Sequence, residues 1–137
     1  MFFTTTRLTL RPALPEDAGM TVSFRHAPDL GDADRFDPRF PPSVVLDSSG
    51  DEIGMVLTWP EPTGGWRLEF ALFESARGKG YAREMIRAWG HRFQQECPSD
   101  TLTAWVKPDD GAAESVLRFA GFELAGEGRY QLPSLAR

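Results

Sequence analysis

The chain has 137 residues, of which 41% are hydrophobic and 26% charged, a composition that is ordinary for one soluble globular domain. No segment reaches the roughly 20 apolar residues of a membrane span, and the net charge of -5 argues against non-specific binding to nucleic acid. The single Cys97 excludes an internal disulfide and a cysteine-based metal cluster, and the two histidines argue against a His-rich zinc site, though not against a carboxylate-bound ion. The N-terminus lacks the pattern of a secretory signal, so we expect a single cytoplasmic domain over residues 1–137, without metal, membrane or nucleic acid.

The first half of the chain predicts four strands, one short helix and an irregular segment. Alternating or continuous apolar runs place these strands at residues 6–12, 43–47, 53–59 and 66–73. A short helix is expected after Pro15, over 15–19. Residues 25–42 hold four prolines and four aspartates and predict irregular structure, and no pattern explains the role of residues 20–52.

The second half predicts two helices and three more strands. A helical stripe of apolar residues begins at Tyr81 and ends before Pro98, and a second helix begins at Asp110 and is capped by Gly121. The strands are expected at residues 101–106, 122–126 and 128–133, the last two as a hairpin. The order is therefore β, short α, three β, α, β, α, β, β, which is an α+β arrangement.

The stretch ESARGKGYARE, residues 74–84, lies between an alternating strand and an amphipathic helix. Backbone N–H groups in the first turn of a helix lack intrahelical partners, and Gly78 and Gly80 let the backbone approach an anion closely. From Arg77 to Arg92 there are five basic residues against one acid, which suits a small anionic ligand. A bare Gly-x-Gly pattern is nevertheless also typical of a simple tight turn, and the signatures of a nucleoside-triphosphate loop and of a dinucleotide fold are missing.

Three segments together resemble the GNAT superfamily of N-acetyltransferases. They are TTRLTLRPALPEDA, RGKGYAREMIRAW and LTAWVKPDDGAAESVLRFAGF, which resemble in order and spacing the first strand, the acetyl-CoA loop and helix, and the fifth strand with its following helix. The nearest branch acetylates protein N-termini, including those of ribosomal proteins. The resemblance implies a GNAT-like α+β fold: a mixed, mostly antiparallel sheet of six to seven strands, flanked by helices and splayed between its fourth and fifth strands.

The resemblance also implies where acetyl-CoA binds. The pantetheine arm would lie in the splay and meet backbone groups of Ala71, Leu72 and Phe73, and Arg83 or Lys79 would meet the remaining phosphate. The pyrophosphate would lie on the amides of residues 77–82, so the expected binding residues of this loop are Arg77, Gly78, Lys79, Gly80, Tyr81 and Ala82. Asp110 stands where the family has an asparagine at the start of the second helix. Ser75 and Leu117 depart from the family pattern, and Leu117 occupies the position of a tyrosine general acid.

Acetyl transfer needs a neutral amine and a proton for the departing thiolate, although positioning alone can supply much of the rate. Glu69 is the candidate base, and a salt bridge with Arg67 or Arg129 is an equally good interpretation of it. Ser115 and Tyr130 are further candidates to reach the thiolate. His26 is a possible base, although a lone histidine in such a segment is more often a surface residue.

The acceptor is harder to predict. The aspartates at 29, 32, 34 and 37 could attract a cationic amine but are more typical of a solvated loop. Of the four tryptophans, Trp66, Trp89 and Trp105 are expected on core faces, whereas Trp59 could line an acceptor cleft. We therefore predict an acetyl-CoA-dependent N-acetyltransferase acting on a primary amine, either a protein N-terminus or a small molecule. The alternatives are a non-catalytic acyl-CoA sensor of the same fold and an interaction domain that pairs through its strand edges, and a homodimer fits any of these functions.

Overall fold

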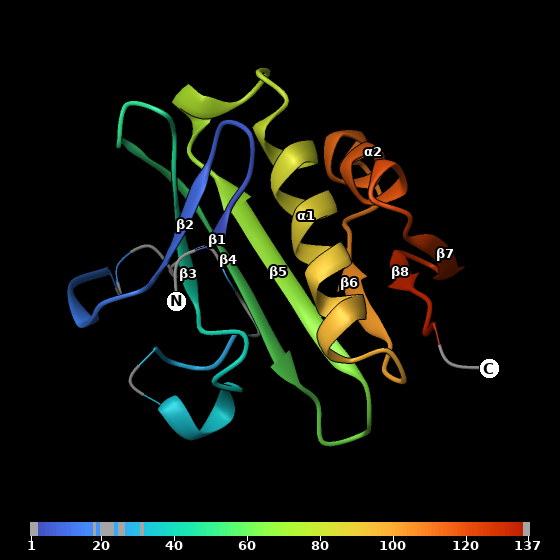
Figure 1. The fold of residues 1–137 in the computed structure, drawn as a ribbon. Helices are drawn as coiled ribbons and strands as arrows, with labels where there is room; N and C mark the ends of the chain where they lie inside the picture. Colours follow the sequence, from blue (N-terminus) through green and yellow to red (C-terminus); the bar gives the residue numbers. More distant parts are fainter. Residues whose placement is uncertain (1–2, 18, 20–23, 25–26, 31, 136–137) are drawn as a thin grey trace.

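The computed structural model describes residues 3–17, 19, 24, 27–30 and 32–135. Eight strands form one sheet in the order β1-β2-β3-β4-β5-β6-β8-β7 (Figure 1). The strands are β1 (Phe3–Thr4), β2 (Thr9–Pro12), β3 (Ser43–Leu46), β4 (Glu52–Pro60), β5 (Trp66–Leu72), β6 (Leu102–Trp105), β7 (Glu123–Gly126) and β8 (Arg129–Leu132). All neighbouring pairs are antiparallel except β5 and β6, which are parallel, so the predicted mixed, mostly antiparallel α+β sheet is confirmed.

The strand count exceeds the expected six to seven by one short strand. β1 contains only two residues, which pair with Leu10 and Thr9 of β2. Two residues are too few to show an alternating pattern, which explains why the sequence did not indicate this strand. The short helix expected over 15–19 lies partly outside the described residues.

Helices α1 (Tyr81–Glu96) and α2 (Gly111–Phe119) lie together on one side of the sheet (Figure 1). The apolar stripe of α1 is buried as predicted, through Met85, Ile86, Trp89, Gly90 and Phe93. These side chains pack on the sheet face that carries Leu10, Val56, Leu68 and Leu102, in the larger of two apolar cores. No described helix has the length and apolar character needed to cross a membrane.

A buried hydrogen bond fixes α1 against the sheet. Trp89 Nε1 donates to Thr58 Oγ1 of β4 at 2.8 Å, and neither side chain is more than 3% exposed. Because a buried donor without a partner is costly, this bond favours one rotation of the helix over others. At the C-terminal end of α1, Cys97 is buried, and burial raises the pKa of its thiol, which does not suit a nucleophile.

The opposite face of the sheet carries a second, smaller core. Phe36 packs there with Val44, Met55, Leu57 and Trp59, and partly buried side chains from the segment between β2 and β3 join them. This segment contains the 3-10 helix η2 (Ala33–Arg35), so the stretch that looked irregular in the sequence covers the face that α1 and α2 leave open. The cover extends over β3 and β4.

Strands β5 and β6 separate soon after they meet. Only two residue pairs join them, Trp66 with Leu102 and Arg67 with Thr103, although β5 continues to Leu72 and β6 to Trp105. Because both strands run in the same direction, the gap opens toward their carboxyl ends. This is the expected splay between the fourth and fifth predicted strands, and it opens toward the loop that leads into α1.

Candidate active site

The backbone of β5 directs alternate residues into the splay. Phe73 N–H donates to Ile53 O at 2.8 Å, toward β4, whereas Trp66 N–H donates to Thr101 O at 2.9 Å, on the β6 side. Since the direction alternates along a strand, the odd-numbered residues of β5 face β4 and the even-numbered ones face β6. Leu72 therefore turns its backbone groups to the splay, whereas Ala71 and Phe73 turn theirs to β4.

The loop at the mouth of the splay has the geometry that its glycines suggested. Gly78 and Gly80 have φ of 81° and 80°, values that residues with a side chain rarely adopt. Gly80 is the N-cap of α1, and no side chain caps that helix terminus among the described residues. The first N–H groups of α1, at Tyr81, Ala82 and Arg83, therefore have no side-chain cap and carry the partial positive charge of the helix dipole. Arg77, Gly78, Lys79 and Gly80 are exposed, so an anion can reach them.

Arg7 anchors this loop from the N-terminal strand segment. Its NH1 donates to Lys79 O at 2.9 Å, its Nε donates to Glu84 Oε1 at 2.7 Å, and its guanidinium lies 4.7 Å from the centre of the Tyr81 ring. Thr5 also donates to the Glu84 carboxylate. Burial by itself raises the pKa of Glu84, but hydrogen bonds from Thr5 and Arg7 outweigh burial and hold the pKa below its ordinary value.

The two helices form a second set of contacts beside the loop. Arg83 NH2 donates to Ser115 Oγ at 2.9 Å, which joins α1 to α2. The guanidiniums of Arg83 and Arg87 lie 5.1 and 5.4 Å from the centre of the Phe119 ring, which is 47% exposed. Sequence reasoning missed Arg87 and Phe119. The signal for Arg87 was its spacing, because a residue four positions after Arg83 lies on the same helix face.

Two other predicted residues of this side have structural partners. Asp110 is the N-cap of α2 and accepts a hydrogen bond from Ala113 N–H at 3.1 Å. Tyr130 is only 3% exposed, and its hydroxyl accepts a hydrogen bond from Arg118 NH2 at 3.5 Å. Both Ser115 and Tyr130 therefore belong to the side of the sheet that carries the helices.

Glu69 lies on the other face of the sheet, as its position in β5 predicted. It pairs in register with Leu57, a residue of the smaller core. Its Oε1 is 3.8 Å from Nε of Arg67, and each of the two side chains is 16% exposed. The salt bridge with Arg67 that the sequence allowed is thus present. The three candidate catalytic residues do not come together, since Glu69 is separated from Ser115 and Tyr130 by the sheet.

The tryptophans correct two expectations. Trp59, which could have lined an acceptor cleft, is 2% exposed and belongs to the smaller core, whereas Trp105, expected in a core, is 52% exposed. Leu102 and Ala104 are the buried residues of β6, so Trp105 falls on the opposite face by alternation. The same alternation was visible in the sequence TLTAWV. Trp105 is therefore an exposed aromatic residue on the face that Glu69 shares.

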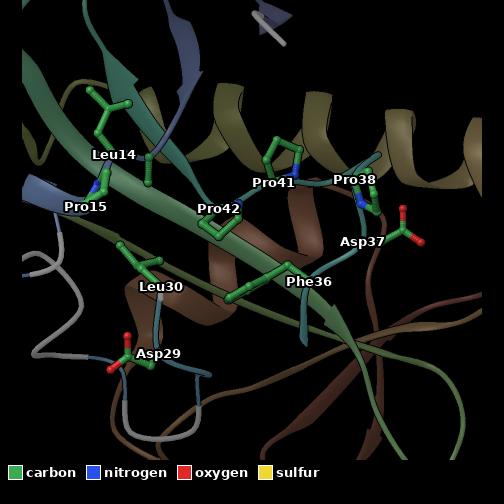
Figure 2. A pocket seen from close by; sticks show the side chains of 10 residues that line it. Leu14, Pro15, Asp29, Leu30, Phe36, Asp37, Pro38, Pro41 and Pro42 are labelled. Atoms are coloured by element: carbon green, nitrogen blue, oxygen red, sulfur yellow. The ribbon is translucent and has the colours of Figure 1, made fainter. Parts of the chain in front are cut away.

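An apolar pocket of about 480 Å³ lies in the segment that covers this face. Figure 2 shows Leu30 and Phe36 on one side of Pro42, and Leu14 and Pro41 on the other. Asp29 and Asp37 also line the pocket. Asp37 is not available as a bare charge, because Arg39 donates to both of its oxygens at 3.0 Å, and these hydrogen bonds lower its pKa. His26, which the sequence offered as a base, lies outside the described residues.

Comparison with known proteins agrees with this geometry. The sequence model of the acetyltransferase (GNAT) domain family matches residues 7–123, and the chain therefore belongs to this family and is by class an N-acetyltransferase. No curated protein sequence matches it.

Among solved structures, the chain is similar to RimL, a ribosomal L7/L12 alpha-N-protein acetyltransferase in complex with coenzyme A, with a TM-score of 0.78 at 14% identity over 100% of each chain. It is also similar to an acetyltransferase from Agrobacterium tumefaciens, with a TM-score of 0.69 and 21% identity over 96% of this chain and 93% of that one. A third similar structure is a mutant of spermidine N-acetyltransferase from Vibrio cholerae, with a TM-score of 0.69 and 16% identity over 93% of this chain and 92% of that one. At these identities the likeness is one of fold.

Proposed function

We propose that the protein transfers the acetyl group of acetyl-CoA to a primary amine. One observation carries this proposal: the one parallel strand pair among the described strands opens toward a glycine loop and toward the N-terminus of α1, which no described side chain caps. The opening can receive an extended chain with amide groups, and the loop can receive a phosphate. Acetyl-CoA combines these two parts in one molecule.

The residues of the loop fit a pyrophosphate. The N–H groups of Gly78, Gly80, Tyr81 and Ala82 supply uncharged donors, and Arg77 and Lys79 add charge beside them. In β5 the backbone of Leu72 turns toward the splay, and by the same alternation so does that of Phe70. We therefore assign the contacts with the pantetheine arm to Leu72 and Phe70, in preference to Ala71 and Phe73.

Arg83, Arg87 and Phe119 fit the remaining part of the donor. An exposed aromatic ring flanked by two guanidiniums offers a stacking surface for a base and charge-assisted donors for a phosphate. Arg83 and Arg87 lie in the first two turns of α1, and Phe119 is the last residue of α2 beside them. We assign to them the 3′-phosphoadenosine end of acetyl-CoA, and to Ser115 the role of positioning Arg83.

The reaction divides between the two faces of the sheet. The amine nitrogen forms a bond to the acetyl carbon, the carbon–sulfur bond breaks, and the amine proton must leave while the thiolate gains one. In this proposal Glu69 takes the amine proton on the face away from the helices, and Arg67, 3.8 Å away, orients its carboxylate. On the helix side, the Tyr130 hydroxyl is our candidate for the proton that reaches the thiolate.

The acceptor would approach from the face that carries Glu69. The apolar pocket lined by residues 13–15, 29–30, 36–38 and 41–42 lies on this face and can hold an apolar part of the acceptor. Protein N-termini and spermidine are acetylated by proteins of similar fold, according to their names. The fold alone does not choose between such acceptors.

Two measurements test the proposal. Calorimetry should show binding of acetyl-CoA, and a thiol-release assay over a panel of amines should show turnover. Tight binding without turnover on any amine would instead make the protein an acyl-CoA sensor. Absence of binding would overturn both.

A further inference from the structure

Three side chains gather on the sheet face opposite the helices, at the base of the splay. The guanidiniums of Arg67 from β5 and Arg129 from β8 lie 5.8 and 5.9 Å from the centre of the Trp105 ring. Trp105 and Arg129 are a cross-strand pair, and Arg67 lies on the neighbouring strand. We call Arg67, Trp105 and Arg129 the arginine–tryptophan cluster.

The charges of this cluster are not balanced. Glu69 is the one carboxylate that the described part of the chain places against it, with Oε1 3.8 Å from Arg67 Nε, so two guanidiniums face one carboxylate there. Arg129 donates to the carbonyl of Ala125 at 2.8 Å, a neutral acceptor that does not offset its charge. Among the described residues, neither Arg67 Nε nor Arg129 Nε has a hydrogen bond, although both atoms are buried. Partly buried guanidiniums with unused donors are costly unless an acceptor satisfies them, and an anion is the strongest acceptor for a guanidinium.

An anion at this position has a specific chemical meaning. The acceptor amine must be neutral when it attacks, and two nearby guanidiniums disfavour a second cation. They would therefore repel a polyamine, whose other amino groups stay protonated. A carboxylate close to the amine would instead be bound by the planar donors of an arginine. The exposed ring of Trp105 adds an apolar surface beside it.

We propose that the arginine–tryptophan cluster selects the acceptor, and that the acceptor is an amine that carries a carboxylate near its amino group. The inference rests on the proposed acetyl transfer. Two sources offer this chemistry, a free α-amino acid and a peptide whose first residues are acidic. Asp37 on the same face does not oppose it, because Arg39 already neutralises that carboxylate.

The experiment compares acceptors that differ only in charge. Thiol release is measured for L-phenylalanine and L-phenylalaninamide, for peptides beginning Ser-Asp and Ser-Lys, and for spermidine. The amine of L-phenylalaninamide is less basic than that of L-phenylalanine, so a larger fraction of it is neutral near pH 7. Without any contact to the carboxylate, the amide should therefore be the better acceptor. We expect the acidic member of at least one pair to have a kcat/KM about tenfold higher, the usual effect of one charge-assisted hydrogen bond. The first pair reports on a free amino acid and the second on a peptide.

Variants connect the preference to the cluster. Arg129→Gln should reduce the ratio of kcat/KM for the acidic acceptor to kcat/KM for its partner to near one. Arg129→Glu should reverse the preference, so that spermidine and the Ser-Lys peptide become the better acceptors. Arg67→Gln should act in the same direction if it folds, which thermal unfolding checks. Arg92→Gln is the matched control, because it removes a guanidinium that lies on Phe3, on the helix side of the sheet, and should leave the ratio unchanged.

A binding measurement does not depend on turnover. Tryptophan fluorescence should change when the preferred acid is added to the protein with CoA, and this change should disappear in Trp105→Phe. Turnover with equal rates for acid, amide and spermidine would overturn this inference and leave the transferase intact, as would an unaltered ratio in Arg129→Gln. No turnover of any acceptor, with acetyl-CoA bound, would overturn the transferase and this inference together.

Discussion

Arg7 reaches 77 residues along the chain to bind Glu84, and the same guanidinium holds the carbonyl of Lys79. One side chain from the N-terminal segment thus fixes the glycine loop and the first turn of α1 to the sheet. The loop can therefore present its N–H groups in a preset arrangement before any ligand arrives. An ordered loop loses less conformational entropy on binding.

We expect Arg7→Ala to weaken acetyl-CoA binding about tenfold, which corresponds to about 1.4 kcal/mol. The Arg7 side chain is 44% exposed, so its ion pair should contribute only about 1 kcal/mol or less to the free energy of unfolding. Calorimetry and denaturant unfolding separate the two effects. Arg11→Ala is the control, because Arg11 binds Asp17 and Glu52 away from the loop. Equal losses of affinity in both variants would contradict a specific role for Arg7.

Glu84 should make stability depend on pH in the acidic range. Its pKa is lower in the folded protein than its ordinary value of 4.5, so its contribution is present above that value. The contribution is lost as the pH falls through the lowered pKa. Glu84→Gln should be less stable than the wild type by about 1 to 3 kcal/mol at pH 7, with a gap that shrinks below pH 4.5.

Urea unfolding of both proteins between pH 7 and pH 3 measures this gap. Asp17 and Asp37 also have lowered pKa values, but they titrate in both proteins and cancel in the difference. A gap that stays constant with pH would show that Glu84 acts through packing alone.

Gly80→Val should impair acetyl-CoA binding more than Lys79→Ala. A side chain at residue 80 would be strained at φ 80°, and its Cβ would lie 3.3 Å from Arg7 NH2. The Lys79 side chain contributes only an exposed charge, so Lys79→Ala should lower the affinity for acetyl-CoA only a few-fold. Gly50→Val is the matched control, since Gly50 has φ 84° in a distant turn with no neighbour within 4 Å of a Cβ. It should lose stability but keep its affinity.

Arg87 and Phe119 should recognise the 3′-phosphoadenosine end of the donor. The wild type should prefer acetyl-CoA to its 3′-dephospho analogue. Arg87→Gln should lose most of that preference, because its KM should rise for acetyl-CoA but not for the analogue. Phe119→Ala should raise KM for both donors, because it removes stacking from both. Arg92 lies farther along α1, where its guanidinium lies on the Phe3 ring. Arg92→Gln should therefore leave the preference for acetyl-CoA over the 3′-dephospho analogue intact.

Glu69→Gln should lower kcat about a hundredfold and leave acetyl-CoA affinity unchanged, because a positioned base contributes about 10² or more. Steady-state kinetics with calorimetry distinguish this result from a loss of donor binding. An unchanged kcat would show that positioning alone supports the transfer, and that Glu69 serves only to hold Arg67.

Local patterns were sufficient to predict most of the fold. Alternation indicated β4 and β5, and the 3.6-residue period indicated the buried stripe of α1. The two glycines indicated the loop, because their positive φ is a local requirement of the backbone. These features depend on residues that are close in the sequence.

The features that could not be predicted depend on contacts between distant segments. The sequence gives no indication that Arg7 meets Glu84 or that Arg83 meets Ser115, since such pairs require knowledge of which strands are neighbours. The exposure of Trp105 is a different case. The alternation of faces along β6 was visible in the sequence and placed Trp105 opposite the buried Leu102 and Ala104. The general tendency of tryptophan to be buried was nevertheless given more weight in the prediction.

The two-residue pairing of β5 with β6 has a mechanical consequence. The sheet is continuous on either side of it, so this short ladder is the weakest backbone pairing between β1–β5 and the strands β6, β8 and β7. A donor whose amide groups bond to Leu72 and Phe70 would add rungs beside β5, where the carbonyl of Leu72 accepts a hydrogen bond from Arg77 Nε at 3.3 Å. Binding the substrate would then complete the sheet, and amide hydrogens of both halves should exchange more slowly once it is bound.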